Sequence, residues 1–338
     1  PAPTAADAST ETLVALRAVY RRHLLHLAGR DLTGVLDVGE VAAELADLAS
    51  AALEAGLAVA RTEVPEADSC RLAVIGMGKC GGRELNYVSD VDVIFVAEPR
   101  PGHDETEALR AASRLASGLM RACSASTPEG ALWEVDAALR PEGKAGPLVR
   151  TLASHRAYYE RWAKTWEFQA LLKARPVAGD MELGADYIDA IAPLVWKAAA
   201  GEEFVEDIQA MRRRVEEHLY KRTEETDRQL KLGPGGLRDV EFAVQLLQLV
   251  HGRADETLRS RGTLEALSLL SEGGYVGRDD AAGLASAYRF LRNVEHLLQL
   301  HRLRRTHTVP DDPADLRRLG RALGLRTDPV GEFTRLWR

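Results

Sequence analysis

The hydrophobic positions divide the chain into a short strand-rich stretch flanked by two longer helical stretches. Apolar runs at residues 72–75 and 91–96 have the length and β-branched content of buried strands. Residues 12–27 and 38–59 repeat apolar side chains at helical spacing instead, and helical spacing dominates from Leu152 onward. The pattern predicts two N-terminal helices, then a sheet, then a mostly helical remainder.

A turn rich in glycine lies between the two predicted strands. Glycines let backbone N–H groups approach a phosphate closely, and a lysine or arginine adds positive charge. The candidate anion-binding residues of this turn are Gly78, Lys79, Gly81, Gly82 and Arg83. The alternative is an ordinary tight turn, in which the glycines serve only the backbone.

Ser89, Asp90 and Asp92 stand where the second strand begins. Alternate side chains of a strand share a face, so the two aspartates point the same way. At about 4 Å and an effective dielectric near 20, two carboxylates repel by roughly 4 kcal/mol, so a proton or a cation is expected between them. Oxygen ligands shared with substrate phosphates favour Mg²⁺. For Asp90, a turn or helix-capping role is the alternative.

Residues 132–139 alternate apolar and polar side chains like a half-buried strand. Glu134 and Asp136 lie on the same face, and periodicity does not choose between them. Arg140 follows this strand directly and is a candidate for contact with substrate, with a surface salt bridge as an equally good explanation.

The remaining segments predict an α+β protein with helices beside the sheet. Residues 107–123 form the expected helical crossover, and residues 281–305 repeat leucines at seven-residue spacing, as in a bundle. Lys173 and Arg175 flank a helix end, where phosphate contact and dipole pairing are equally good explanations. The expected domains are residues 1–65 (N-terminal helices), 66–150 (the sheet domain) and 151–338 (a helical domain).

Composition narrows the class of protein. The chain has 338 residues, 46% hydrophobic content and a formal net charge of -7, so its bulk charge does not favour a nucleic-acid partner. Its three cysteines form no CxxC pair, which favours a reducing cytoplasm. No apolar run approaches about 18 residues, so no membrane span is expected. The chain stops within a helical pattern, which indicates a piece of something longer.

The order of strand, Gly-Lys turn, Ser-Asp-x-Asp and strand resembles the DNA polymerase β-like nucleotidyltransferase superfamily. Longer blocks are similar to those of the bifunctional glutamine synthetase adenylyltransferase/adenylyl-removing enzymes. These blocks are GMGKCGGRELNYVSDVDVIF, VDAALRPEGKAGPLV, KARPVAGD, KLGPGGLRDVEFAVQ and FLRNVEHLLQ. The resemblance implies a polymerase β-like sheet with a flanking helical bundle. It also implies that Asp90, Asp92 and Asp136 bind Mg²⁺ and perform catalysis.

Only one catalytic signature is present, and its GMGK, ELN and GGLRDVEF details look like the N-terminal, deadenylylating half of that family. The resemblance thus implies Mg²⁺-dependent phosphorolysis of adenylylated glutamine synthetase, with inorganic phosphate consumed and ADP released. It further implies a PII signalling protein and a C-terminal adenylyltransferase half as partners. ATP-dependent adenylylation and a non-catalytic nucleotide- or PII-binding module are the alternatives. One or two metal ions, and the roles of Glu134, Asp239 and Glu241, stay open.

Overall fold

The computed structural model describes residues 5–198 and 226–337, which fall into two compact units. The unit that contains the sheet, here the sheet unit, comprises residues 5–27, 42–85 and 89–198. The helical unit comprises residues 28–41, 86–88 and 226–337. Two short segments, residues 28–41 and 86–88, thus belong to the helical unit although the residues before and after them belong to the sheet unit.

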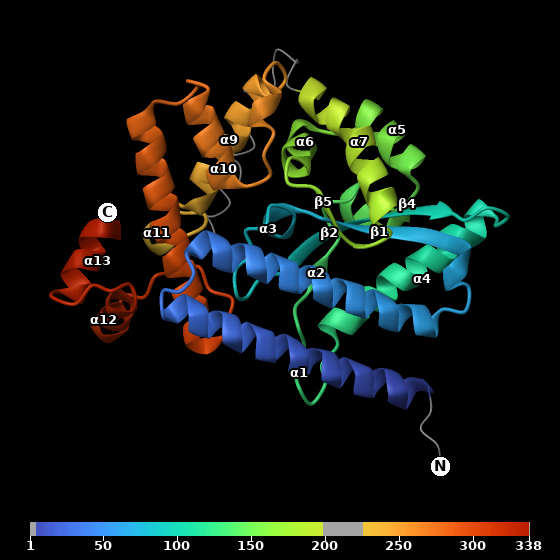
Figure 1. The fold of residues 1–338 in the computed structure, drawn as a ribbon, viewed down its shortest axis with the longest axis horizontal. Helices are drawn as coiled ribbons and strands as arrows, with labels where there is room; N and C mark the ends of the chain where they lie inside the picture. The colour runs from blue at the N-terminus through green and yellow to red at the C-terminus, as the bar shows by residue number, and fades with distance from the viewer. Residues whose placement is uncertain (1–4, 199–225, 338) are drawn as a thin grey trace. The chain divides into compact units, whose positions relative to one another are not determined.

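A five-stranded mixed sheet forms the centre of the sheet unit (Figure 1). Its strands are β1 (Cys70–Gly76), β2 (Val91–Pro99), β3 (Val135–Asp136), β4 (Val149–Arg150) and β5 (Arg175–Gly179). Strand β1 pairs antiparallel with β2 and β5, whereas β2 pairs parallel with β3 and β4. Successive residues of β1 and β2 are buried, because helices cover both faces of the sheet.

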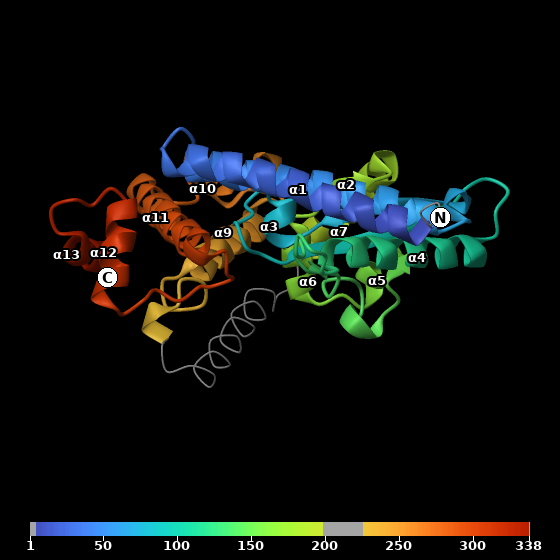
Figure 2. The same ribbon diagram turned by 90° about the horizontal axis from the view of Figure 1, so that it is seen from below.

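Helices α4 (Glu105–Ser124) and α7 (Met181–Ala198) pack against β1 and β2, and Figure 1 shows them on opposite sides of the strands. The side chain of Asp104 accepts a hydrogen bond from the Glu107 N–H at 3.0 Å and so caps α4 at its start. Helices α1 (Ala5–Leu32) and α2 (Val38–Glu63) lie side by side in both Figure 1 and Figure 2. The small side chains of Gly118 and Ala60 let α4 and α2 approach closely, because a Cβ at 118 would come within 2.7 Å of the Ala60 Cβ.

Two shorter helices, α5 (Leu152–Arg161) and α6 (Thr165–Leu171), connect β4 to β5. Thr151 caps the start of α5, and its side chain accepts a hydrogen bond from the Ser154 N–H at 3.2 Å. Helix α6 ends just before β5, so the chain returns from the helices to the free edge of β1.

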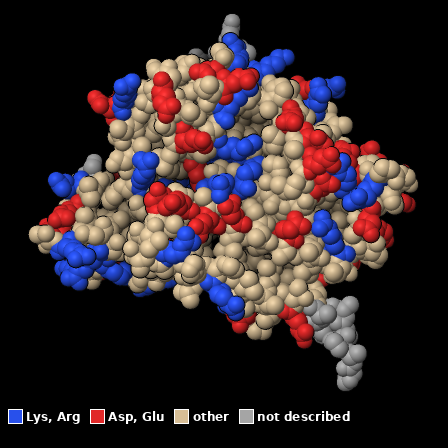
Figure 3. All heavy atoms as spheres, in the orientation of Figure 1, with Lys and Arg blue, Asp and Glu red and all other residues tan. Residues whose placement is uncertain are grey.

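The helical unit is built on its own hydrophobic core. Its main helices are α9 (Leu237–His251), α10 (Thr263–Glu272), α11 (Arg278–Arg302), α12 (Pro313–Ala322) and α13 (Pro329–Trp337). Helix α11 contributes the buried side chains of Tyr288, Leu291, Val294 and Leu298, which confirms the predicted periodicity. A basic cluster gathers over α12 at the left of Figure 3.

The predicted α+β class is confirmed, with two corrections in detail. The strand expected at residues 132–139 is wrong in extent, because only Val135–Asp136 pair with β2 before the chain turns away. The stretch expected to be almost purely helical contains β5, so the sheet extends past residue 150. The three-domain division stays a prediction, and its third part includes residues 199–225, which lie outside the described residues. Among the described helices, none is long and apolar enough to cross a membrane.

Candidate functional site

The pairing of β2 with β3 brings two of the predicted aspartates side by side. Asp92 is the register partner of Asp136 in this parallel pair. Neighbouring strands lie about 4.8 Å apart, and paired residues project from the same face. Both side chains are half-buried. The Val91 N–H donates to the Glu134 carbonyl at 3.0 Å, so the pairing begins one residue after Asp90, which is also half-buried.

The glycine turn lies directly against this pair. The Met77 N–H donates to the Asp92 carbonyl oxygen at 2.8 Å, and the short helix α3 (Gly78–Gly81) follows at once. Gly78 has φ +49°, a conformation that favours glycine, and a Cβ placed there would stand 2.8 Å from Oδ2 of Asp92. The turn and the Asp92 carboxylate therefore form one contiguous surface that only a glycine permits.

Other parts of the turn have a packing role. Gly81 is buried, and a Cβ there would lie 1.9 Å from the Lys173 carbonyl oxygen and 2.4 Å from that of Gly76. Arg175 donates to the carbonyl oxygens of Cys80 at 3.0 Å and Gly81 at 3.1 Å. Arg175 thus satisfies carbonyl groups at the end of α3, which otherwise lack helical partners.

Two more cations near the turn are engaged by carboxylates. Arg83 forms an ion pair with Asp47 of α2, and both side chains are about half exposed. Lys173 forms an ion pair with Glu84, and here the exposed fractions are only 7% and 12%. Lys79, in the first turn of α3, is half-buried. Lys173 thus has an ion-pair partner and Arg175 has carbonyl partners within the protein, and contact of either with phosphate stays a prediction.

Arg140 orders the loop that follows Asp136. Its guanidinium donates to the carbonyl oxygens of Ala137, Lys144, Gly146 and Pro147 at 2.8 to 3.3 Å. Burial lowers the pKa of Arg140, and the charge of Asp136 acts in the opposite direction. The loop is therefore held in place by a cation that lies beside the site.

Asp239 and Glu241 have structural partners in the helical unit. An Asp239 carboxylate oxygen accepts a hydrogen bond from the Gly235 N–H at 2.8 Å, where α9 begins. The carboxylate of Glu241 accepts a hydrogen bond from the Tyr288 hydroxyl at 3.2 Å. These contacts favour the structural interpretation of both residues.

The carboxylates at the start of β2 supply oxygen ligands of the kind that Mg²⁺ prefers. One oxygen of Asp136 accepts a hydrogen bond from the Ala138 N–H at 2.8 Å, and the Ser89 hydroxyl lies 3.3 Å from an oxygen of Asp90. Across residues 5–198 and 226–337, no three His, Cys, Asp or Glu side chains already form a group able to enclose a metal ion. Mg²⁺ usually takes one or two protein carboxylates and completes its shell with water and substrate phosphates, so the donor set fits it. Convergence of all three aspartates stays a prediction.

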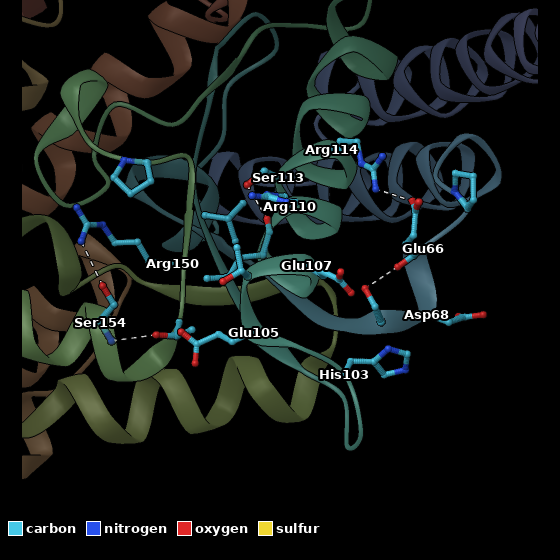
Figure 4. A pocket seen from close by; sticks show the side chains of 17 residues that line it. Glu66, Asp68, His103, Glu105, Glu107, Arg110, Ser113, Arg114, Arg150 and Ser154 are labelled. Atoms are coloured by element: carbon cyan, nitrogen blue, oxygen red, sulfur yellow. Dashed lines mark hydrogen bonds and ion pairs between the residues drawn. The ribbon is translucent and has the colours of Figure 1, made fainter.

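A large hollow of about 1140 Å³ lies elsewhere in the sheet unit, at the opposite end of the sheet (Figure 4). It is lined by residues around Ser69, by the first turns of α4 and by β4. Cys70 pairs with Pro99, whereas Gly76 pairs with Val93, so this hollow and the glycine turn lie at different ends of β1. An ion pair between Arg114 and Glu66 lies in its lining. None of the predicted site residues lines it.

Comparison with known proteins gives two family matches. Residues 4–189 match the family described as glutamate-ammonia ligase adenylyltransferase, and residues 209–337 match the one described as GlnD PII-uridylyltransferase.

The chain is also similar to curated proteins named bifunctional glutamine synthetase adenylyltransferase/adenylyl-removing enzyme. It is 68% identical over 329 residues to the one from Streptomyces coelicolor, a match that covers 96% of this chain and 33% of that protein. The identity is 58% over 322 residues for the one from Mycolicibacterium smegmatis, covering 93% of this chain and 31% of that protein. The protein from Cutibacterium acnes is 53% identical over 328 residues, which cover 95% of this chain and 33% of that protein. The chain thus spans about a third of the length of these relatives.

Proposed function

Because the chain belongs to the glutamate-ammonia ligase adenylyltransferase family, we propose that it removes AMP from the adenylylated tyrosine of glutamine synthetase by Mg²⁺-dependent phosphorolysis. The products are ADP and unmodified glutamine synthetase. The observation that carries the proposal is the register pair of Asp92 and Asp136 beside the Gly78 turn. The direction rests on the GMGK and ELN details of the sequence, which resemble the deadenylylating half of such enzymes.

Each group in the site has a part in this reaction. Asp90, Asp92 and Asp136 would hold Mg²⁺, which neutralises charge on the entering and departing oxygens when it is bound. The backbone N–H of Gly78 and the ammonium of Lys79 bind phosphate oxygens, whereas the N–H groups of Gly81 and Gly82 donate to the carbonyl oxygens of Met77 and Gly78. Arg140 keeps the loop after Asp136 in place, and Arg83 ties the turn to α2, so both shape the site.

The bond changes need no strong general base. An oxygen of inorganic phosphate, already anionic at neutral pH, forms a bond to the phosphorus of the AMP group. The bond from that phosphorus to the tyrosine oxygen breaks in line with it. The tyrosine leaves as a phenolate, whose free pKa is near 10, and it takes a proton from water. The catalytic requirement is therefore positioning and charge neutralisation.

The proposed partners follow from the same comparisons. Glutamine synthetase is the protein substrate named by the relatives, and the match of residues 209–337 supports a PII signalling protein as a regulator. A C-terminal adenylyltransferase half would follow in a longer chain, since the relatives extend well beyond the matched third. The cytoplasm is the proposed location, because the three cysteines form no CxxC pair.

Two parallel incubations test the direction of the reaction. In the first, the 338-residue chain receives glutamine synthetase carrying labelled AMP, with Mg²⁺ and inorganic phosphate, and labelled ADP is expected. In the second, it receives unmodified glutamine synthetase and labelled ATP, and little labelled protein is expected. Labelling only in the second incubation would establish the attaching reaction instead. No product in either, with folded protein, would favour the non-catalytic regulatory module.

A further inference from the structure

The short segment Asn86–Val88 connects the glycine turn to the aspartate at the start of β2. Its contacts place it in the helical unit, although the residues on both sides of it belong to the sheet unit. Only Ser89 separates Val88 from Asp90. Contacts that hold this segment therefore restrict the position of Asp90.

Gln299 of α11 binds this segment at two points. Its Oε1 accepts a hydrogen bond from Nδ2 of Asn86 at 2.8 Å and a second from the Val88 N–H at 2.9 Å. The same Nδ2 donates to the Val88 carbonyl oxygen at 3.1 Å, which closes the segment on itself. Asn86 is 2% exposed and Gln299 is fully buried. These contacts are thus shielded from water, and hydrogen bonds are stronger in the protein interior than in water.

The residue between them is held as well. The Tyr87 hydroxyl donates to Oδ2 of Asp31 at 2.8 Å. The Tyr87 ring meets the ring of His296 edge to face, with 5.2 Å between centroids. His296 stands one turn before Gln299 on α11 and is also buried. Helix α11 therefore contacts all three residues of the segment through two of its side chains.

The two ends of the Gln299 amide group differ in their contacts. The Nε2 of Gln299 is buried and has no hydrogen-bond partner among the described residues. A buried donor left unpaired is unfavourable, but the oxygen of the same amide is the acceptor that the Val88 N–H and Nδ2 of Asn86 use. The amide thus provides two directed hydrogen bonds to one short segment. Buried hydrogen bonds of this kind rigidify the groups that they join.

We propose that Gln299 is a positioning residue that sets the place of Asp90 through the Asn86–Val88 segment. The inference rests on the proposed function, because it assigns Asp90 to the site of AMP removal. It adds that Gln299 of α11, which lies 213 residues further along the chain than Asn86, is required for an efficient reaction.

A matched pair of substitutions tests this. Gln248 of α9 is also a buried glutamine, 2% exposed, and its Nε2 donates to the carbonyl oxygens of Leu258 and Ser260 at 2.8 Å each. Gln299→Met and Gln248→Met therefore remove the same side-chain amide and two hydrogen bonds from the same unit. Only the first change touches the Asn86–Val88 segment.

We expect Gln299→Met to lower kcat for ADP release by about 10- to 100-fold, because small displacements of reacting groups reduce rates by such factors. The half-saturating Mg²⁺ concentration should rise, whereas KM for the protein substrate should stay within about twofold. Amide hydrogen exchange at Val88 should become faster, since its N–H loses its acceptor. Gln248→Met should leave all of these values near those of the unsubstituted chain.

Equal kcat values and equal exchange at Val88 in the two variants would overturn the proposal. If Gln299→Met does not fold, Gln299→Glu serves instead, because it keeps an acceptor oxygen in the same place and should retain both activity and protection of Val88. Loss of activity with protection of Val88 retained, in a folded Gln299→Glu chain, would also count against it. If the unsubstituted chain releases no ADP, the proposed function fails, and the exchange comparison still tests the contact with the segment.

Discussion

Replacing Gly78 with alanine should impair the site more than the fold. Gly78 has φ +49°, and left-handed backbone costs an L-residue roughly 1–2 kcal/mol. The added Cβ would stand 2.8 Å from Oδ2 of Asp92, whereas ordinary contact begins at 3.4 Å, so the carboxylate or the turn must move by about 0.6 Å. A shift of this size in a group that binds the reacting phosphates should lower kcat about tenfold or more.

Gly34→Ala is the matched control for this change. Gly34 has φ +70°, and a Cβ there meets nothing within 4 Å, so the substitution introduces the backbone strain without the contact. Urea unfolding should show a similar loss of stability for both variants, of roughly 1–2 kcal/mol. Phosphate-dependent ADP release should fall only for Gly78→Ala. Full activity of a folded Gly78→Ala chain would refute the assignment of the turn to the site.

Two further predictions concern stability. Lys173→Met should lower the free energy of unfolding by about 3–5 kcal/mol, because the carboxylate of Glu84 loses its ammonium partner. Urea unfolding measures this loss. A double variant that also carries Glu84→Leu should lose less stability than the single variant. His155 is buried, and its burial lowers the pKa to about 4. In the unfolded chain this histidine takes up a proton below its ordinary pKa near 6.5, whereas in the folded chain it stays neutral until about pH 4. The free energy of unfolding should therefore fall as the pH is lowered from about 6.5 to about 4. His155→Phe should flatten that part of the pH dependence, and an unchanged curve would contradict the assignment.

The sequence predicted the parts of the fold whose periodicity is strong. Strands β1 and β2 and helices α4 and α11 appear where their apolar spacing placed them, because each element buries a long, regular face. The two-residue strands β3 and β4 offer too few positions for any period to show. Strand β5 was missed because Pro176 and Gly179 are unusual in strands. It is an edge strand with a register shift, where a missing N–H is tolerated.

In the candidate site too, the sequence predicted features that depend on neighbouring residues better than features that depend on residues far apart in the chain. The spacing of Asp90 and Asp92 on one strand face is local, and the sequence predicted it directly. The register that sets Asp136 beside Asp92 depends on where a short strand stops, and only the resemblance to a known family selected it over Glu134.

The roles of charged and polar neighbours depended on partners far away in the sequence. Lys173 meets a carboxylate 89 residues earlier, and Gln299 meets an amide 213 residues earlier. No periodicity in either segment identifies such partners. Opposite charge made the first pair conceivable, whereas nothing in the sequence singled out a glutamine on a helix face.

The paired carboxylates of Asp92 and Asp136 carry the proposed reaction. Phosphate-dependent ADP release by Asp92→Asn and Asp136→Asn chains, with Asp104→Asn as the control, tests this role directly. Asp104 caps α4, and asparagine caps a helix about as well, so the control makes the same chemical change away from the site. We predict a loss of ADP release of at least about 100-fold for each of the first two variants, with the fold retained, and no loss for the control. Near-normal release from folded Asp92→Asn or Asp136→Asn protein would contradict the claim.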